Sequence, residues 1–253
     1  MKIYCVQLDI VWENKPASYQ RVERLLEATP PLPGSLVLLP ELFSTGFSMN
    51  VPAVREGRQR ETERFLAGLA RKHGAFMLGG LVVCKTNGKG TNQALVFAPD
   101  GQEVARYSKL QTFTPGGETD NYDAGQAIVL FDWQGFTVAP FICYDLRFPE
   151  HFRTATRRGA QLITVIANWP VARIHHWVTL LQARAVENQA YVAGVNRVGT
   201  DPKLTYNGQS LIISPKGEIL SQAGQGECVI SAEVSLSELM IYRKKLPFLA
   251  DMR

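Results

Sequence analysis

Short apolar runs of about four to nine residues recur along most of the chain, and polar or turn-forming segments separate them. Runs of this length bounded by turn residues are typical of β-strands. The pattern predicts strands at residues 3–8, 36–39, 75–83, 92–98, 104–108, 128–131, 137–142, 162–166, 191–195 and 210–213.

Other stretches place their apolar residues three or four positions apart, which is the period of a helix with one buried face. In residues 15–28, for example, Val22, Leu25 and Leu26 fall on one face. Residues 149–158 begin with a proline, which suits a first helical turn. The predicted helices are residues 15–28, 61–72, 149–158 and 176–189.

Three tight-turn sequences lie between apolar runs and predict β-hairpins, at residues 99–101, 133–135 and 215–217. The chain therefore mixes hairpins with strand–helix–strand crossovers. This mixture indicates an α/β fold, a layered sandwich of mixed sheets covered by helices. No linker, composition break or internal repeat divides the sequence, so we expect a single domain over residues 1–253.

Composition narrows the class of protein. The chain has 253 residues, of which 45% are hydrophobic, and disorder is excluded as its main state. A net charge of +4 gives no reason to expect a nucleic-acid partner. No apolar run approaches the roughly 18 residues that cross a bilayer, and the N-terminal residues do not resemble a signal peptide. We therefore expect no nucleic acid and no membrane among its partners.

The cysteines stand at positions 5, 84, 143 and 228, without the short spacing that zinc sites use. Few, scattered cysteines in a chain of this length favour the cytoplasm, where thiols stay reduced. His175 and His176 are adjacent, but no carboxylate at helical spacing completes a metal site. We expect neither a metal nor another cofactor.

Cys143 has the most informative context. An apolar strand ends at this residue, and a polar segment and a helix signal follow it. In α/β proteins, a side chain at such a strand-to-helix turn faces the end of the sheet, where active sites lie. A helix N-terminus nearby would favour a thiolate. A buried, inert cysteine fits the same pattern equally well, and we expect the other three cysteines to be core residues.

Two charged residues also follow apolar strands directly. Glu41 comes after four aliphatic residues and a proline, where burial would raise its pKa and suit it to act as a base near neutral pH. A helix-capping or loop glutamate is the alternative. Lys109 directly follows the predicted strand at residues 104–108. A lone lysine in such a position is usually solvated.

In combination, these segments resemble the nitrilase superfamily of carbon–nitrogen hydrolases, and within it the bacterial omega-amidases. The resemblance extends from residue 6 to residue 217. It rests on residues 40–43 (Pro-Glu-Leu-Phe), 107–110 (Tyr-Ser-Lys-Leu), 142–150 (Ile-Cys-Tyr-Asp-Leu-Arg-Phe-Pro-Glu), 115–118 (Pro-Gly-Gly-Glu), 168–170 (Asn-Trp-Pro) and 183–189. It implies a four-layer α-β-β-α sandwich with two mixed sheets.

The resemblance also implies a mechanism. Cys143 would be the nucleophile, Glu41 the base, and Lys109 the cation beside the oxyanion, with the Tyr144 backbone N–H as a second donor. Glu118 would orient Lys109 or Glu41, although a passive loop role is the alternative. Many relatives have histidine where this chain has Gln111, two residues after the lysine.

The implied substrate is the omega-amide of a small keto acid, such as 2-oxoglutaramate or 2-oxosuccinamate, hydrolysed through a cysteine thioester. Its carboxylate needs a cation, and arginines 147, 173 and 197 are the candidates. For Arg147, the alternative is a structural ion pair with Asp145. Three aromatic residues near the motifs are candidate pocket residues or core residues, namely Phe43, Tyr144 and Trp169.

Other readings remain open. The same residues serve in aliphatic amidases, N-carbamoyl amino acid hydrolases and nitrilases, and a non-catalytic binding protein could share the fold. A Cys–His hydrolase would use His175 or His176. The resemblance further implies a homodimer, with the helix after Cys143 and the apolar residues 246–249 as contacts.

Overall fold

The computed structural model describes residues 1–252, and two six-stranded mixed sheets form its centre. In the first sheet, β1 to β3 run parallel, β4 and β5 continue antiparallel, and β14 pairs antiparallel with β1. Its strands, in spatial order, are β14 (Cys228–Glu233), β1 (Lys2–Gln7), β2 (Leu36–Leu38), β3 (Phe76–Cys84), β4 (Gly90–Phe97) and β5 (Glu103–Ser108).

The second sheet repeats this arrangement. Strands β7 to β9 run parallel, β12 and β13 continue antiparallel, and β6 pairs antiparallel with β7. Its strands, in spatial order, are β13 (Ile219–Gln222), β12 (Leu211–Ile213), β9 (Tyr191–Asn196), β8 (Leu162–Ala167), β7 (Phe136–Ile142) and β6 (Phe131–Trp133). The fold thus contains a structural repeat that the sequence does not reveal.

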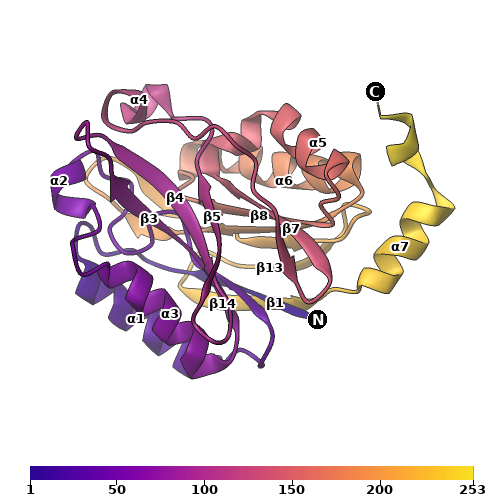
Figure 1. The fold of residues 1–253 in the computed structure, drawn as a ribbon, viewed down its shortest axis with the longest axis horizontal. Helices are drawn as coiled ribbons and strands as arrows, with labels where there is room; N and C mark the ends of the chain where they lie inside the picture. Colours follow the sequence, from indigo (N-terminus) through magenta and orange to yellow (C-terminus); the bar gives the residue numbers. More distant parts are fainter. Residues whose placement is uncertain (253) are drawn as a thin grey trace.

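Helices cover the outer faces of both sheets (Figure 1). On the first sheet lie α1 (Lys15–Ala28) and α3 (Glu61–His73), and on the second lie α5 (Pro149–Arg157) and α6 (Ile174–Asn188). This arrangement is the expected four-layer α-β-β-α sandwich. Helix α7 (Leu236–Lys245) extends beyond the sheets towards the C-terminus (Figure 1).

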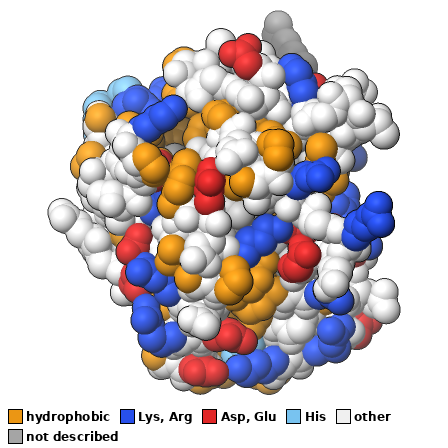
Figure 2. Space-filling view, turned by 90° about the vertical axis from the view of Figure 1, so that its left-hand side faces the viewer, with side chains coloured by type: hydrophobic (Ala, Val, Ile, Leu, Met, Phe, Trp, Pro, Cys, Tyr) orange, Lys and Arg blue, Asp and Glu red, His pale blue; other side chains and the backbone are white. Residues whose placement is uncertain are grey.

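Short elements complete the chain. They are α2 (Val51–Val54), α4 (Glu118–Asn121), the ribbon of β10 (Val198–Thr200) and β11 (Thr205–Asn207), and the 3₁₀ helices η1 (Thr114–Gly116), η2 (Cys143–Arg147), η3 (Val171–Arg173) and η4 (Phe248–Asp251). None of the described helices is long and apolar enough to cross a bilayer. Acidic and basic side chains are interspersed over the face in Figure 2, in keeping with the small net charge.

One large hydrophobic cluster joins the two sheets. It contains Cys5 and Leu38 from the first sheet together with Phe141 and Val165 from the second, all fully buried. A second cluster lies between the first sheet and helices α1 and α3. Burial of the inward faces of both sheets is therefore what holds the sandwich together.

The predicted helix at residues 15–28 and all three predicted hairpins are confirmed. The strand predicted at residues 128–131 is wrong, because only Phe131 belongs to β6. Residues 128–130 are apolar since they pack against the main core, not because they pair in a sheet. Strand β14 and helix α7 escaped prediction, because their exposed or half-exposed residues give no clear apolar period.

Gly80, in the middle of β3, allows an unusually close approach of the loop that follows β2. A Cβ atom built on Gly80 would lie 2.4 Å from the Leu42 nitrogen and 2.8 Å from the Glu41 Cα atom. These are backbone atoms that cannot rotate away, so any side chain at position 80 must push the loop off the sheet. Leu42 itself has a positive φ of 45°, which shows how tightly this loop turns.

We therefore expect Gly80→Ala to displace Glu41 and to lower both thermal stability and any activity that depends on Glu41. Gly68→Ala is the matched control, because nothing lies within 4 Å of a Cβ atom at that position of α3. It should stabilise the protein by up to about 1 kcal/mol. Thermal unfolding curves of the two variants measure the contrast. Equal melting temperatures would show that the close approach is unimportant.

Candidate active site

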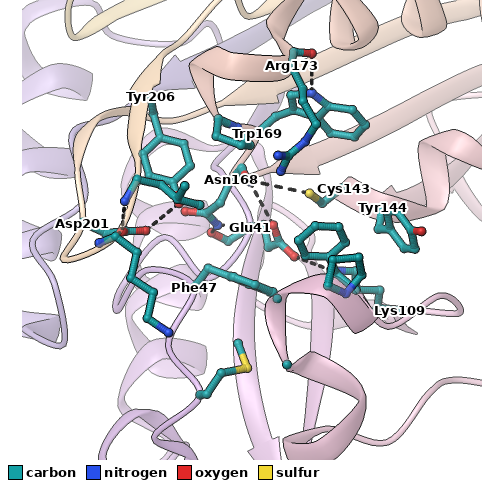
Figure 3. Close-up of a pocket in the computed structure, with 18 of the residues that line it drawn as sticks. Glu41, Phe47, Lys109, Cys143, Tyr144, Asn168, Trp169, Arg173, Asp201 and Tyr206 are labelled. Atoms are coloured by element: carbon teal, nitrogen blue, oxygen red, sulfur yellow. Dashed lines mark hydrogen bonds and ion pairs between the residues drawn. The ribbon is translucent and has the colours of Figure 1, made fainter.

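Glu41, Lys109 and Cys143 meet at one edge of the sandwich because each follows a strand that ends there. Glu41 lies just beyond β2, Lys109 follows β5, and Cys143 follows β7. Strand β5 runs in the same direction as β2, because two antiparallel pairings separate it from β3. Residues predicted from separate motifs are thus brought together in space (Figure 3).

Lys109 is 1% exposed and lies between two fully buried carboxylates. Its Nζ atom donates to Glu41 Oε1 at 2.9 Å and to the two oxygens of Glu118 at 2.8 and 3.1 Å. The backbone N–H of Phe113 donates to Glu118 Oε2 at 2.6 Å. Glu118 therefore contacts Lys109 directly.

Two asparagines that the sequence analysis did not identify complete this cluster. Asn92 Nδ2 donates to Glu41 Oε1 at 2.7 Å and to Glu118 Oε1 at 3.0 Å, so one amide bridges both carboxylates. Asn168 donates to Glu41 Oε2 from its backbone N–H, at 2.9 Å, and to the Glu41 carbonyl from Nδ2, at 2.7 Å. Asn168 lies in one of the family motifs of the sequence. Asn92 lies inside a strand, and no sequence pattern distinguished it as a site residue.

The charges of the cluster stabilise one another. Burial disfavours the ionised form of Glu41, but the Lys109 charge and the hydrogen bonds from Lys109, Asn168 and Asn92 outweigh it, and the pKa of Glu41 is lowered. The expectation that burial would raise this pKa is therefore wrong. Burial also opposes the charge on Lys109, but Glu118 and Glu41 raise its pKa well above the ordinary value.

Cys143 occupies a strained position at the start of η2, with a φ of 45°. Its Sγ atom lies 3.9 Å from the Asn168 carbonyl oxygen. Burial and the neighbouring Glu41 charge raise the pKa of the Cys143 thiol well above its ordinary value. The expected thiolate is therefore not the resting form. The site instead pairs a thiol with an ionised carboxylate.

The other cysteines differ from one another. Cys5 is fully buried, whereas Cys84 and Cys228 are partly exposed, so only Cys5 is the expected core residue. All four cysteines are free thiols.

Asp145 organises the turn that carries Cys143. Its carboxylate accepts hydrogen bonds from the Ile142 N–H at 2.9 Å, the Tyr107 hydroxyl at 2.7 Å and the Gln111 N–H at 2.8 Å. The turn is thereby tied to the loop that carries Lys109. The alternative pairing of Arg147 with Asp145 is wrong, because these three donors occupy the carboxylate and Arg147 contacts other groups.

A cavity of about 560 Å³ opens beside the cluster. Tyr144, Arg147 and Trp169 line it, as expected, together with Arg173. The Arg147 guanidinium lies 4.9 Å from the centre of the Trp169 ring, and that of Arg173 lies 5.6 Å from the Phe113 ring. Within residues 1–252, neither arginine forms an ion pair with a carboxylate, so both are available to an anionic ligand.

Two expected ligand residues are instead structural. Phe43 is fully buried in the cluster beneath α1 and α3, where it contacts Tyr19 and Phe65, so its assignment to the substrate pocket is wrong. Arg197 is also fully buried. It donates to the backbone carbonyls of residues 10, 198 and 200 and does not line the cavity.

None of the four histidines lines this cavity. His176 Nδ1 pairs with Arg147, and His151 pairs with Gln111. A Cys–His arrangement therefore has no support in the geometry. Within the described part of the chain, no three His, Cys, Asp or Glu side chains are grouped to hold a metal ion.

Comparisons with known proteins show the family. The sequence model of the carbon–nitrogen hydrolase family matches residues 2–244, and the chain belongs to this family. The chain is 39% identical to omega-amidase YafV of Yersinia enterocolitica, over 99% of this chain and 96% of that protein. It is 34% identical to 2-oxoglutaramate amidase of Bacillus subtilis, over 99% and 97% of the two chains.

A solved structure is also similar. XC1258 of Xanthomonas campestris, a CN-hydrolase superfamily protein, has an arsenic adduct in its active site. It superposes with a TM-score of 0.91 at 32% identity, covering 100% of this chain and 97% of that one.

The protonation states of the site predict its dependence on pH. Because the pKa of Cys143 is raised well above its ordinary value and the pKa of Glu41 is lowered, the thiol–carboxylate pair persists through neutral pH. We expect kcat/KM to show no rise between pH 7 and 9 that tracks thiol ionisation. Initial rates across this range test the expectation. A tenfold rise to a plateau near pH 9 would contradict it.

We further expect Asn92→Leu to lower kcat by roughly ten- to a hundredfold, because a hydrogen bond to a charged group contributes about 1.5–3 kcal/mol. The variant removes the donor that Glu41 and Glu118 share. Gln93→Leu is the control, since its amide bonds Ser108 and Arg106 outside the cluster. Steady-state rates of both variants test this expectation. A kcat of Asn92→Leu equal to that of Gln93→Leu would exclude a role for Asn92.

Proposed function

We propose that the protein is an omega-amidase. It hydrolyses the terminal amide of small keto-acid amides, such as 2-oxoglutaramate and 2-oxosuccinamate, to the dicarboxylate and ammonia. The observation that carries this proposal is the cavity where a thiol, an ionised carboxylate and a buried lysine lie beside two guanidinium groups that form no ion pair within residues 1–252. The activities for which the relatives are named support the same substrate class.

In the first half of the proposed reaction, Cys143 Sγ attacks the amide carbon and Glu41 takes the thiol proton. Lys109 Nζ and the Tyr144 backbone N–H stabilise the oxyanion. The carbon–nitrogen bond breaks as Glu41 returns the proton to the leaving nitrogen. Ammonia departs and leaves a thioester on Cys143. Glu41 is suited to this step because it is already ionised beside a neutral thiol.

In the second half, Glu41 removes a proton from water, which attacks the thioester carbon. The tetrahedral intermediate expels the sulfur, which takes the proton held by Glu41 and becomes a thiol again. The product leaves as a carboxylic acid and ionises to the carboxylate by losing its proton to solvent. Glu118 and Asn92 keep Lys109 and Glu41 in place through both halves. One base therefore serves both proton transfers, and no histidine is required.

The carboxylate at the far end of the substrate is bound by Arg147, with Arg173 as a second cation. Arginine can form two parallel hydrogen bonds with a carboxylate. Stacking of Arg147 on Trp169 keeps its guanidinium edge open to the cavity. Tyr144 and Trp169 form part of the apolar wall beside the carbon chain of the substrate.

We also propose a domain organisation and a cellular location for the protein. The chain is a single carbon–nitrogen hydrolase domain over residues 1–253, supported by the core cluster that joins both sheets. Arg253 lies outside the described residues. The protein works in the cytoplasm, where its four free thiols and its cysteine nucleophile stay reduced.

A substrate panel tests the activity. We expect ammonia release from 2-oxoglutaramate or 2-oxosuccinamate at least a hundredfold faster than from N-carbamoyl amino acids or nitriles. Cys143→Ala should abolish the activity without lowering the melting temperature. Faster turnover of nitriles or N-carbamoyl amino acids would assign the same residues to a sister reaction. Turnover by Cys143→Ala would remove the nucleophile assignment.

The protein also forms a homodimer in this proposal. Four large apolar side chains of α7 and the segment after it are 38–67% exposed, namely Met240, Ile241, Leu246 and Phe248. Exposed apolar groups of this kind favour a covered face. The expected interface combines this segment with α5.

We expect the double variant Ile241→Asp, Phe248→Asp to be monomeric in light scattering, whereas the unchanged protein has twice the monomer mass. Leu32→Asp is the control, since Leu32 is 55% exposed outside this segment. A monomeric unchanged protein, or a dimeric double variant, would contradict the proposed interface.

A further inference from the structure

Within residues 1–252, His176 is the one group that accepts a hydrogen bond from the Arg147 side chain. Arg147 Nη2 lies 3.1 Å from His176 Nδ1, and the guanidinium lies 4.9 Å from the Trp169 ring centre. The arginine is thus held at its face by an indole and at one nitrogen by an imidazole. Its other nitrogens remain free for a ligand in the cavity that Arg147 lines.

The direction of this hydrogen bond is fixed by chemistry. A guanidinium stays charged and only donates, so Nδ1 of His176 must accept, and the ring proton must lie on Nε2. His176 is therefore neutral. The charged and titratable groups that face it are His175 in α6, Arg147 in η2 and Arg173 in η3, and all of them are bases. Burial and these neighbours lower the pKa of His176, which is consistent with a neutral acceptor.

His176 is itself held in place. It lies in the first turn of α6 next to Trp177, which is fully buried, and the Trp177 indole N–H donates to the Gln209 carbonyl at 2.7 Å. Trp177 also contacts Trp169, with 5.6 Å between ring centres. The acceptor and the indole that hold Arg147 therefore belong to one packed unit. His175, by contrast, is exposed and makes no hydrogen bond to Arg147.

We propose that His176 is a positioning residue that fixes the Arg147 guanidinium for the substrate carboxylate, and so determines the affinity of the site for anionic amides. This inference rests on the proposed function, because it assumes that Arg147 binds that carboxylate. A guanidinium that is already ordered loses less conformational freedom on binding than a mobile one. The effect concerns binding, since His176 touches neither Cys143 nor Glu41.

Steady-state kinetics with 2-oxoglutaramate test the proposal. His176→Ala should raise KM about three- to tenfold and leave kcat within twofold, the loss expected when one long side chain must be immobilised on binding. His176→Asn keeps an acceptor near the Nδ1 position and should restore KM. His175→Ala is the matched control and should behave like the unchanged protein. A KM that stays raised in His176→Asn, or a KM that is unchanged in His176→Ala, overturns the proposal.

A neutral amide separates positioning from general damage to the site. With butanamide, which has no carboxylate, His176→Ala should leave kcat/KM unchanged, whereas an equal loss on both substrates would indicate a merely structural role. In an Arg147→Gln background, His176→Ala should cause no further rise in KM. A further rise would mean that His176 acts through another group.

A measurement that needs no turnover keeps this inference distinct from the proposed function. Nitrogen NMR of the histidines should show His176 with its proton on Nε2, and its pKa should rise in Arg147→Gln because a neighbouring cation is lost. A proton on Nδ1 overturns the inference even in an active enzyme. If neither keto-acid amide is hydrolysed, the proposed function fails, while the NMR result still decides the Arg147–His176 contact.

Discussion

Lys109 is a charged side chain with almost no access to water, and the site depends on how that charge is balanced. Removing an ion from water costs several kcal/mol, so a buried ammonium persists only among opposite charges with good geometry. Glu41 and Glu118 supply those charges at 2.8–3.1 Å, and Asn92 bridges their oxygens. One cation between two carboxylates leaves a net negative charge. Burial and this excess raise the pKa of the adjacent Cys143, which stays a thiol, whereas Lys109 and the hydrogen bonds from Asn168 and Asn92 keep Glu41 ionised.

The sandwich is what makes this cluster possible. Glu41 and Lys109 come from the first sheet, whereas Cys143 and Asn168 follow strands β7 and β8 of the second. Asn168 connects the two sheets, because it donates to both the side chain and the backbone of Glu41. Gly80 lets the Glu41 loop lie directly on β3. Small shifts between the sheets would therefore reach Glu41, Lys109 and Cys143 together.

The sequence predicted the fold class, and its resemblance to a family predicted that Glu41, Lys109 and Cys143 share one site, since each follows an apolar strand within a family motif. It was insufficient for their protonation states. The pKa of Glu41 depends on Asn92 and Asn168, which are 51 and 127 residues away along the chain. Burial alone suggested that the pKa of Glu41 would be raised. Phe43 and Arg197 were misassigned for a similar reason, because proximity to a motif does not reveal whether a side chain faces the cavity or the core.

The central claim is that the resting site holds a neutral thiol beside an ionised Glu41. A thiolate absorbs ultraviolet light more strongly than a thiol, so a pH titration of the unchanged protein minus Cys143→Ser isolates Cys143 from the other three cysteines. The account predicts no thiolate absorbance from Cys143 at pH 7 and an onset only above 9.0, the ordinary thiol pKa. Full thiolate absorbance at pH 7 would instead mean that Lys109 pairs with a preformed thiolate, and would contradict the account.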